Sequence, residues 1–144
     1  MIKAPKELRQ FAKGADQSTF DVADEVVFIN LLYQTMIRGG LDKAEGLRRG
    51  RLVVSFLDEV LSSPYSDAEL ADMWNRSGAE FWFPVENIRT WLTLVRDNID
   101  AINGQVEAGL FVALDHQGNP WPVQPYNHCV LAEPGLRGFD AVRR

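Results

Sequence analysis

The sequence predicts a mainly α protein, a compact bundle of about four helices with a short C-terminal β-hairpin or irregular extension. Apolar residues recur at helical spacing in four segments, and capping and stop signals flank these segments. Beyond Gly104, prolines and short apolar runs replace this pattern. A chain of 144 residues is expected to form one domain, 1–144. Within it we expect an N-terminal arm at 1–19, a helical core at 20–104 and an appendage at 105–144.

The N-terminal arm and the first core helix are separated by turn signals. Residues 5–11 are expected to form a short helical turn that Gly14 interrupts. Ser18 and Asp21 then form a weak version of a capping box, which indicates a helix start. A Gly-Gly pair at 39–40 predicts its end, because glycine adopts the left-handed conformation without a clash. The apolar stripe of this helix consists of Val22, Val26, Ile29, Leu32, Tyr33, Met36 and Ile37.

The second core helix is expected to span about residues 43–62. Gly46 and Gly50 lower the helix propensity of its first half, which leaves open a start as late as Arg51. A Ser-Pro pair at 63–64 predicts its end, because the residue before proline avoids the helical conformation. Its inward residues are expected to be Leu47, Val54, Leu57, Val60 and Leu61.

The third and fourth core helices follow at once. Ser66 and Glu69 form a full capping box, and the third helix is expected to stop at Gly78. An extended aromatic connector, FWFP at 81–84, leads to a fourth helix from about residue 86 to 103 that an Asn-Gly pair ends. The inward residues are expected to be Leu70, Met73, Trp74, Ile88, Trp91, Leu92, Val95, Ile99 and Ile102.

The C-terminal appendage reads as irregular or β structure. Residues 110–114 are expected to form a strand and residues 117–119 its turn. A return strand through 121–123 is interrupted by prolines, so it fits only at an edge. Residues 130–131 offer one more short strand.

The distribution of charge is the main functional signal. Residues 58–80 hold six acidic side chains against one arginine, a net −5, which equals the net charge of the whole chain. A focused acidic surface favours a basic protein partner and disfavours nucleic acid, because phosphate is repelled. An ordinary solvated face explains the acidic residues as well, and partner binding remains the alternative. The expected partner-binding residues are Asp58, Glu59, Asp67, Asp72, Glu80 and Trp82.

The sequence contains no recognisable catalytic, metal or cofactor motif, so we expect no enzyme activity and no cofactor. His128 and Cys129 are adjacent, and adjacent residues of an extended segment face opposite sides, which disfavours a joint site with His116. RRGR at 48–51 is the one basic cluster that the sequence suggests, and a solvated helix start explains it best. No membrane span or signal peptide is expected, and one cysteine suits a reducing, cytoplasmic location.

The order of these signals resembles one known family. Residues 56–101 contain an acidic-apolar helix, S-D-A-E-L, Gly78, an aromatic with Pro84 and then R-T-W-L-T-L-V-R-D. This order is similar to that of the immunity proteins of bacterial contact-dependent growth inhibition (CDI) systems. The resemblance implies a small cytoplasmic antidote that binds the toxin domain of a cell-surface effector, often a nuclease. It implies that the acidic residues pair with toxin lysines or arginines and that Trp82 is the apolar anchor.

Two other classes of function remain open. A helical adaptor or transcriptional accessory module would use Arg48 and Arg49 to meet nucleic acid or an acidic partner. An enzyme would need His116, His128 and Cys129 to converge with a carboxylate. The oligomeric state stays undetermined at this level.

Overall fold

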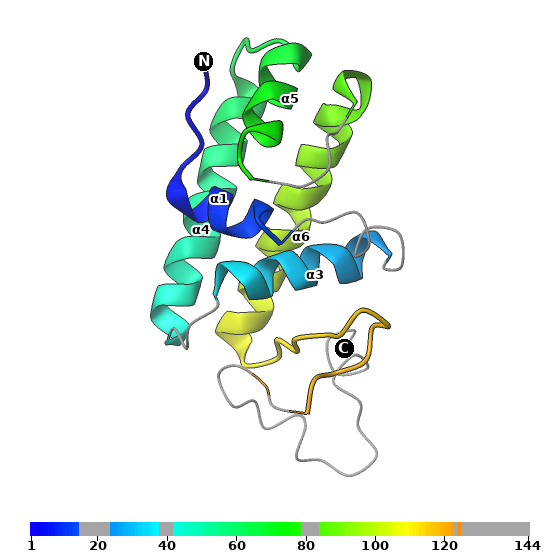
Figure 1. Cartoon of the computed structure of the whole chain (residues 1–144). Coiled ribbons are helices and arrows are strands. Elements are labelled where there is room, and N and C mark those ends of the chain that lie inside the picture. The colour runs from blue at the N-terminus through cyan, green and yellow to red at the C-terminus, as the bar shows by residue number, and fades with distance from the viewer. Residues whose placement is uncertain (15–23, 38–41, 79–83, 123, 125–144) are drawn as a thin grey trace.

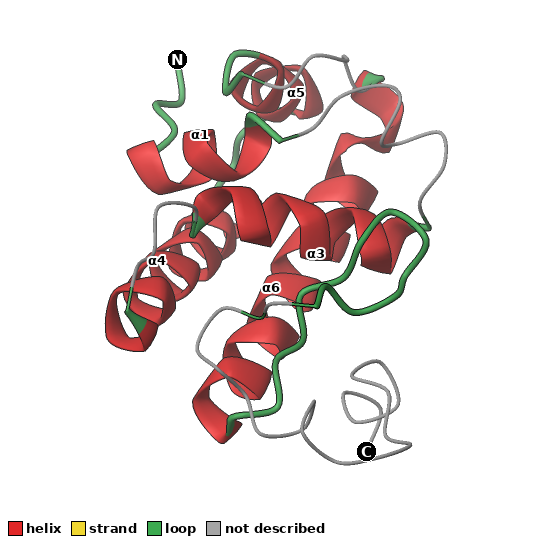
Figure 2. Ribbon diagram, turned by 60° about the horizontal axis from the view of Figure 1, so that its bottom comes forward, coloured by secondary structure: helices red, strands yellow, loops and turns green. Residues whose placement is uncertain are grey.

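The computed structural model describes residues 1–14, 24–37, 42–78, 84–122 and 124. These residues form a mainly helical, compact structure, which confirms the predicted fold class. The long helices α4 and α6 pack antiparallel, and α3 crosses them as a second layer together with α1 (Figures 1 and 2). The elements are α1 (Lys6–Ala12), α3 (Glu25–Met36), α4 (Lys43–Ser62), α5 (Asp67–Asn75), the 3-10 turn η1 (Val85–Asn87) and α6 (Ile88–Ala108).

The described part of the predicted arm is an integral part of the core. Leu8, Phe11 and Ala12 of α1 are fully buried, and Ile2 packs against the same core. The short helix at residues 5–11 is confirmed, but its description as an arm is wrong for residues 1–14. The apolar side chains of α1 cover α3 and α4, because three apolar residues on one face of even a short helix are enough to dock it.

Helix α3 begins later than the sequence suggested. Its N-cap is Asp24, whose carboxylate accepts a hydrogen bond from the backbone N–H of Val27 at 2.8 Å. Val26 was expected to be buried and is 59% exposed. The helix instead turns Phe28 toward α6, where its ring packs on Trp91 with centroids 5.8 Å apart. The expected cap at Ser18, the stripe residue Val22 and the Gly-Gly stop at 39–40 lie outside the described residues.

Helix α4 spans the predicted residues in full. Its N-cap Asp42 accepts from the N–H of Glu45 at 2.8 Å, so the alternative start at Arg51 is wrong. Gly50 stays inside the helix because α6 approaches it closely. A Cβ at this position would lie 2.0 Å from Oδ1 of Asn103. The close contact between α4 and α6 therefore requires glycine at position 50.

Helix α5 has the predicted capping box. The Ser66 hydroxyl accepts from the N–H of Glu69 at 3.1 Å, and the Glu69 carboxylate accepts from the N–H of Ser66 at 3.0 Å. Leu70, Met73 and Trp74 are buried as predicted. The indole of Trp74 meets that of Trp91 edge-on at 5.5 Å, which joins α5 to α6.

The apolar stripe predicted for α6 is buried in full, but the predicted end of this helix is wrong. The helix continues past Asn103 and Gly104 to Ala108, and Gly109 ends it in the left-handed conformation with φ 77°. Asn103 is buried inside the bundle, where its Oδ1 accepts a hydrogen bond from the Tyr33 hydroxyl at 3.1 Å. A polar contact of the core therefore uses a residue type that usually marks a turn.

The expected hairpin is reduced to a turn, and no strand forms among the residues that the structure describes. A single antiparallel bridge joins Leu114 to Pro120. The buried Asn30 of α3 replaces a neighbouring strand: its Nδ2 donates to the carbonyl of Val112 at 3.1 Å, and its Oδ1 accepts from the N–H of Leu114 at 3.0 Å. On the other edge, the Gln124 amide pairs with both backbone groups of Ala113 at 2.6 and 2.9 Å. The expected strand at 130–131 lies outside the described residues.

Candidate acidic interface

The second half of α4, α5 and the first part of α6 hold exposed or partly exposed carboxylates. We call this region, with η1, the acidic surface. Ion pairs between Asp58 and Arg96 and between Asp67 and Arg89 join its helices. Two expected interface residues, Glu80 and Trp82, lie outside the described residues. The charged members of the acidic surface are Asp58, Glu59, Asp67, Glu69, Asp72, Glu86, Asp97 and Asp100, with Arg76, Arg89 and Arg96.

The acidic surface has its densest charge around Arg96. Asp58 on α4 accepts two hydrogen bonds from the guanidinium, at 2.7 and 3.3 Å. Asp97 and Asp100 lie 3.3 and 3.8 Å from the same group. The hydrogen bond from Arg96 lowers the pKa of Asp58, so this carboxylate is ionised at neutral pH. Three carboxylates around one guanidinium leave a local charge of −2 at neutral pH.

The other two predicted aspartates are also paired. Asp67 accepts from Nε of Arg89 at 2.6 Å, and Asp72 accepts from Nε of Arg76 at 2.7 Å. Arg89 also donates to the backbone carbonyl of Tyr65 at 2.6 Å, so it fixes the turn between α4 and α5. The sequence did not indicate that arginines of α6 pair with acids of α4 and α5.

Glu59 and Glu69 differ in what holds them. The carboxylate of Glu59 is exposed and has no partner among the described residues. The carboxylate of Glu69 accepts from the backbone N–H of Ser66 and from its hydroxyl, and these bonds lower the pKa of Glu69. Glu59 is therefore the predicted residue that is free to meet a partner, whereas Glu69 is occupied as a cap.

Asp97 and Asp100 are interface candidates that the sequence reasoning missed. They lie beyond residue 80, outside the acidic segment 58–80 that the sequence indicated. The antiparallel packing of α6 on α4 brings them to Asp58. The signal available in the sequence was their place on the polar side of the apolar stripe of α6, between Val95, Ile99 and Ile102.

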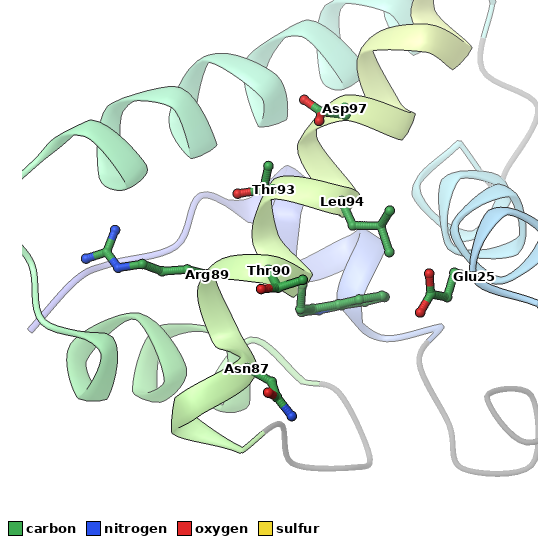
Figure 3. Close-up of a pocket in the computed structure, with 8 residues that line it drawn as sticks. Glu25, Asn87, Arg89, Thr90, Thr93, Leu94 and Asp97 are labelled. Atoms are coloured by element: carbon green, nitrogen blue, oxygen red, sulfur yellow. The ribbon is translucent and has the colours of Figure 1, made fainter.

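A groove of about 670 Å³ lies next to the acidic surface, between α6 and the start of α3. Figure 3 shows Leu94 of α6 extending toward the side of the groove where Glu25 of α3 lies, while the side chain of Arg89 points the other way. Trp91 and Leu94 supply apolar lining, and Asp97 adds a second carboxylate. An apolar lining with acid at its sides suits the long stem and charged end of a lysine or arginine side chain.

The arginines at the start of α4 are held by internal contacts. Arg48 pairs with Glu45 and with Glu7 of α1, and Arg51 pairs with Glu107 of α6. Arg49 donates to the carbonyl of Met36 and to the Gln10 amide, each at 3.0 Å. These contacts join α4 to its neighbouring helices. The arginines at the start of α4 were expected to be solvated, but each of them is paired within the protein.

The alternative enzyme site has one of its residues, His116, in the described part of the chain. His128 and Cys129 lie outside it, and His116 lies in the turn after Leu114. Within the described ranges, no three His, Cys, Asp or Glu side chains are placed to hold a metal ion. None of the described helices is long and apolar enough to cross a membrane.

Comparisons of the chain with protein families, with curated proteins and with solved structures find no match. The functional argument therefore rests on the residues and geometry of the acidic surface.

Proposed function

We propose that this protein is an immunity protein that binds and neutralises a cognate bacterial toxin domain, a nuclease, through its acidic surface. One observation carries the proposal: the three carboxylates of Asp58, Asp97 and Asp100 surround the single guanidinium of Arg96 and leave a local charge of −2. The resemblance of residues 56–101 to CDI immunity proteins supports the same reading. Such an antidote acts in the cytoplasm of the cell that makes the toxin.

The charge pattern fits an inhibitor of a nuclease. A nuclease active site is basic because it binds phosphate, so an acidic protein surface imitates the charge of its substrate. Complementary charge accelerates association and selects among partners. The local excess around Arg96 is the point where a toxin lysine or arginine gains most, because Asp97 and Asp100 have only longer contacts to the shared guanidinium.

The internal ion pairs do not oppose this role. The pairs of Asp58, Asp67 and Asp72 are at the surface, and exposed pairs contribute only about 0–1 kcal/mol to stability. A toxin cation that approaches Asp58 can share the carboxylate with Arg96 at small cost. The groove beside Glu25 gives the same partner a place for one long basic side chain.

The first experiment is co-expression with the C-terminal domain encoded by the gene immediately upstream. We expect a stable one-to-one complex on affinity capture and survival of the host. Cells that die, with toxin recovered free of this protein, would contradict the proposed function.

Association kinetics test the acidic surface itself. Asp97→Lys and Glu107→Lys make the same charge change on two exposed residues of α6, but only Asp97 belongs to the acidic surface. At low salt we expect Asp97→Lys to slow association about tenfold and Glu107→Lys to have little effect. The difference should shrink in high salt, where charges are screened. Equal rates for both variants at low salt would reject the acidic surface as the site of association.

A further inference from the structure

A second surface site has the opposite charge and shares only Arg76 with the acidic surface. The face of α1 and the residues after α5 line a pocket of about 320 Å³. The α1 residues are Lys6, Arg9, Gln10 and Lys13, and Arg76, Ser77 and Gly78 complete the lining. α1 lies beside the C-terminal end of α5 (Figures 1 and 2). Four cations from two segments far apart in the sequence therefore share one pocket on a chain whose net charge is −5.

The lining of this pocket is rich in hydrogen-bond donors. Lys6, Arg9 and Lys13 have no ion-pair partner among the described residues, and no carboxylate belongs to the lining as described. Glu7, on the same short helix, is engaged by Arg48 on another side. Among the described residues, the three cations Lys6, Arg9 and Lys13 form no ion pair, whereas the arginines at the start of α4 are all paired.

Two lining side chains are already oriented by neighbours. Asp72 accepts from Nε of Arg76 at 2.7 Å, which leaves the Nη groups of this guanidinium as further donors. The Gln10 Oε1 accepts from Arg49 at 3.0 Å, so the donor end of the Gln10 amide is the end left for the pocket. Gly78 adopts φ 105°, and a Cβ there would lie 3.1 Å from the Lys13 side chain, so glycine lets the two segments come this close.

The ends of two helices explain why cations gather here, but not the whole arrangement. α1 and α5 both end at this pocket, and the carbonyl end of a helix attracts cations. That attraction accounts for residues in the last turn, such as Arg9 and Lys13. Lys6 is the first residue of α1, where the helix dipole disfavours a cation. Its place in the pocket follows from helical spacing, because residues 6, 9, 10 and 13 lie on one face of α1.

We propose that this pocket binds the phosphate group of a small phosphorylated molecule. Phosphate offers several acceptor oxygens to the guanidinium groups of Arg9 and Arg76, which can each donate two hydrogen bonds, and to the point charges of Lys6 and Lys13. The volume of about 320 Å³ is at the small end of the range for ligand pockets and suits a phosphate with one further ring.

The test is a titration of the full chain followed by NMR amide shifts. The probes are inorganic phosphate, adenosine monophosphate and sodium chloride at matched ionic strength. We expect saturable shifts with phosphate and the nucleotide, confined to residues 6–13 and 76–78. Shifts of equal size with chloride would overturn the proposal, because they would show ionic screening only.

Two double variants make the test specific. Arg9→Gln with Lys13→Gln removes two pocket cations, and Lys3→Gln with Lys43→Gln removes two exposed cations elsewhere. We expect the first to weaken phosphate binding roughly tenfold and the second less than twofold, since only the first removes two of the four cations that line the pocket. Thermal melts check that both variants fold. Equal affinities in the two variants would reject the pocket.

A final arm compares the nucleotide with short single-stranded and duplex DNA. Tighter binding of either oligonucleotide than of adenosine monophosphate, lost in Arg9→Gln with Lys13→Gln, would replace the small molecule by nucleic acid. Tighter binding of the nucleotide supports the proposal as stated.

Discussion

The two halves of α4 carry opposite charges and are held in different ways. In the first half, Arg49 is only 16% exposed and bonds a backbone carbonyl and an amide of two neighbouring helices. In the second half, Asp58 is 53% exposed and bonds one surface arginine. The arginines of the first half are held by contacts within the fold, whereas the carboxylates near Asp58 keep an excess of negative charge. A charge cluster in a sequence thus indicates function only when the folded chain leaves it uncompensated.

The largest expected difference between the two halves is in stability. Arg49→Met keeps the apolar stem but removes the hydrogen bonds, and it leaves the last carbonyl of α3 without its donor. We expect a loss of about 2 kcal/mol in the free energy of unfolding, measured with urea. Asp58→Asn should cost less than about 0.5 kcal/mol, because its pair is exposed.

The control for Arg49→Met is Arg51→Met, the same change two residues along the same helix. Arg51 is exposed and, within the described ranges, pairs with Glu107 alone, so we expect a cost within about 0.5 kcal/mol. Equal losses in the free energy of unfolding at positions 49 and 51 would show that the contacts of Arg49 stabilise the fold no more than an exposed ion pair does.

The same comparison shows which parts of the fold the sequence predicted. Signals that act within one helix were reliable: the full extent of α4, the capping box of α5 and the apolar stripe of α6. Signals that depend on a neighbour failed. Asn103 indicated a turn but is a core residue that is hydrogen-bonded to Tyr33. Val26 was expected in the core, but Phe28 is buried and Val26 is exposed.

The candidate site was predictable to a similar degree. The region of excess acid was found from a linear charge count, and its individual aspartates were named. Their pairing with Arg89 and Arg96, and the addition of Asp97 and Asp100, depend on how α6 lies against α4 and α5. Local sequence contains no information on that register. The basic pocket was missed for the same reason, since Arg76 joins α1 only in the folded chain.

A second prediction concerns the close contact at Gly50, in the first half of α4. In Gly50→Ala the new Cβ would meet Oδ1 of Asn103, and moving that side chain breaks its hydrogen bond with Tyr33. We expect the free energy of unfolding, measured with urea, to fall by about 1.5 kcal/mol. Crowding lowers it, and the better helix propensity of alanine offsets part of that loss.

Gly104→Ala is its matched partner on α6. No atom lies within 4 Å of the position that a Cβ would take there. The same substitution should therefore stabilise the protein by about 0.5 kcal/mol through helix propensity alone. A stabilising Gly50→Ala would mean that the two helices are packed less closely than described.

The smallest expected effect is on the pH dependence of stability. Hydrogen bonds from Arg48 lower the pKa of Glu45 from 4.5 to about 2. A carboxylate whose pKa is lower in the folded state stabilises the fold above pH 4.5, and that contribution is lost as the pH falls from 4.5 toward 2. In Glu45→Gln, unfolding followed by urea should depend less steeply on pH in this window. Asp58→Asn should act in the same direction, since Arg96 lowers the pKa of Asp58. An unchanged pH profile in Glu45→Gln would contradict the pairing.

The clamp that Asn30 places on residues 112–114 has a consequence for folding during synthesis. Asn30 and Leu114 are 84 residues apart, so their hydrogen bond closes one of the longest loops of the described chain. Until residues 112–114 have left the ribosome, the Asn30 amide lacks its two backbone partners and keeps only the bond from Gln34 within α3, and the site of Phe111 beside Tyr33 stays open. A nascent chain that already contains α1, α3, α4 and α5 is therefore still incomplete, and the bundle closes only after α6 and the short segment behind it emerge.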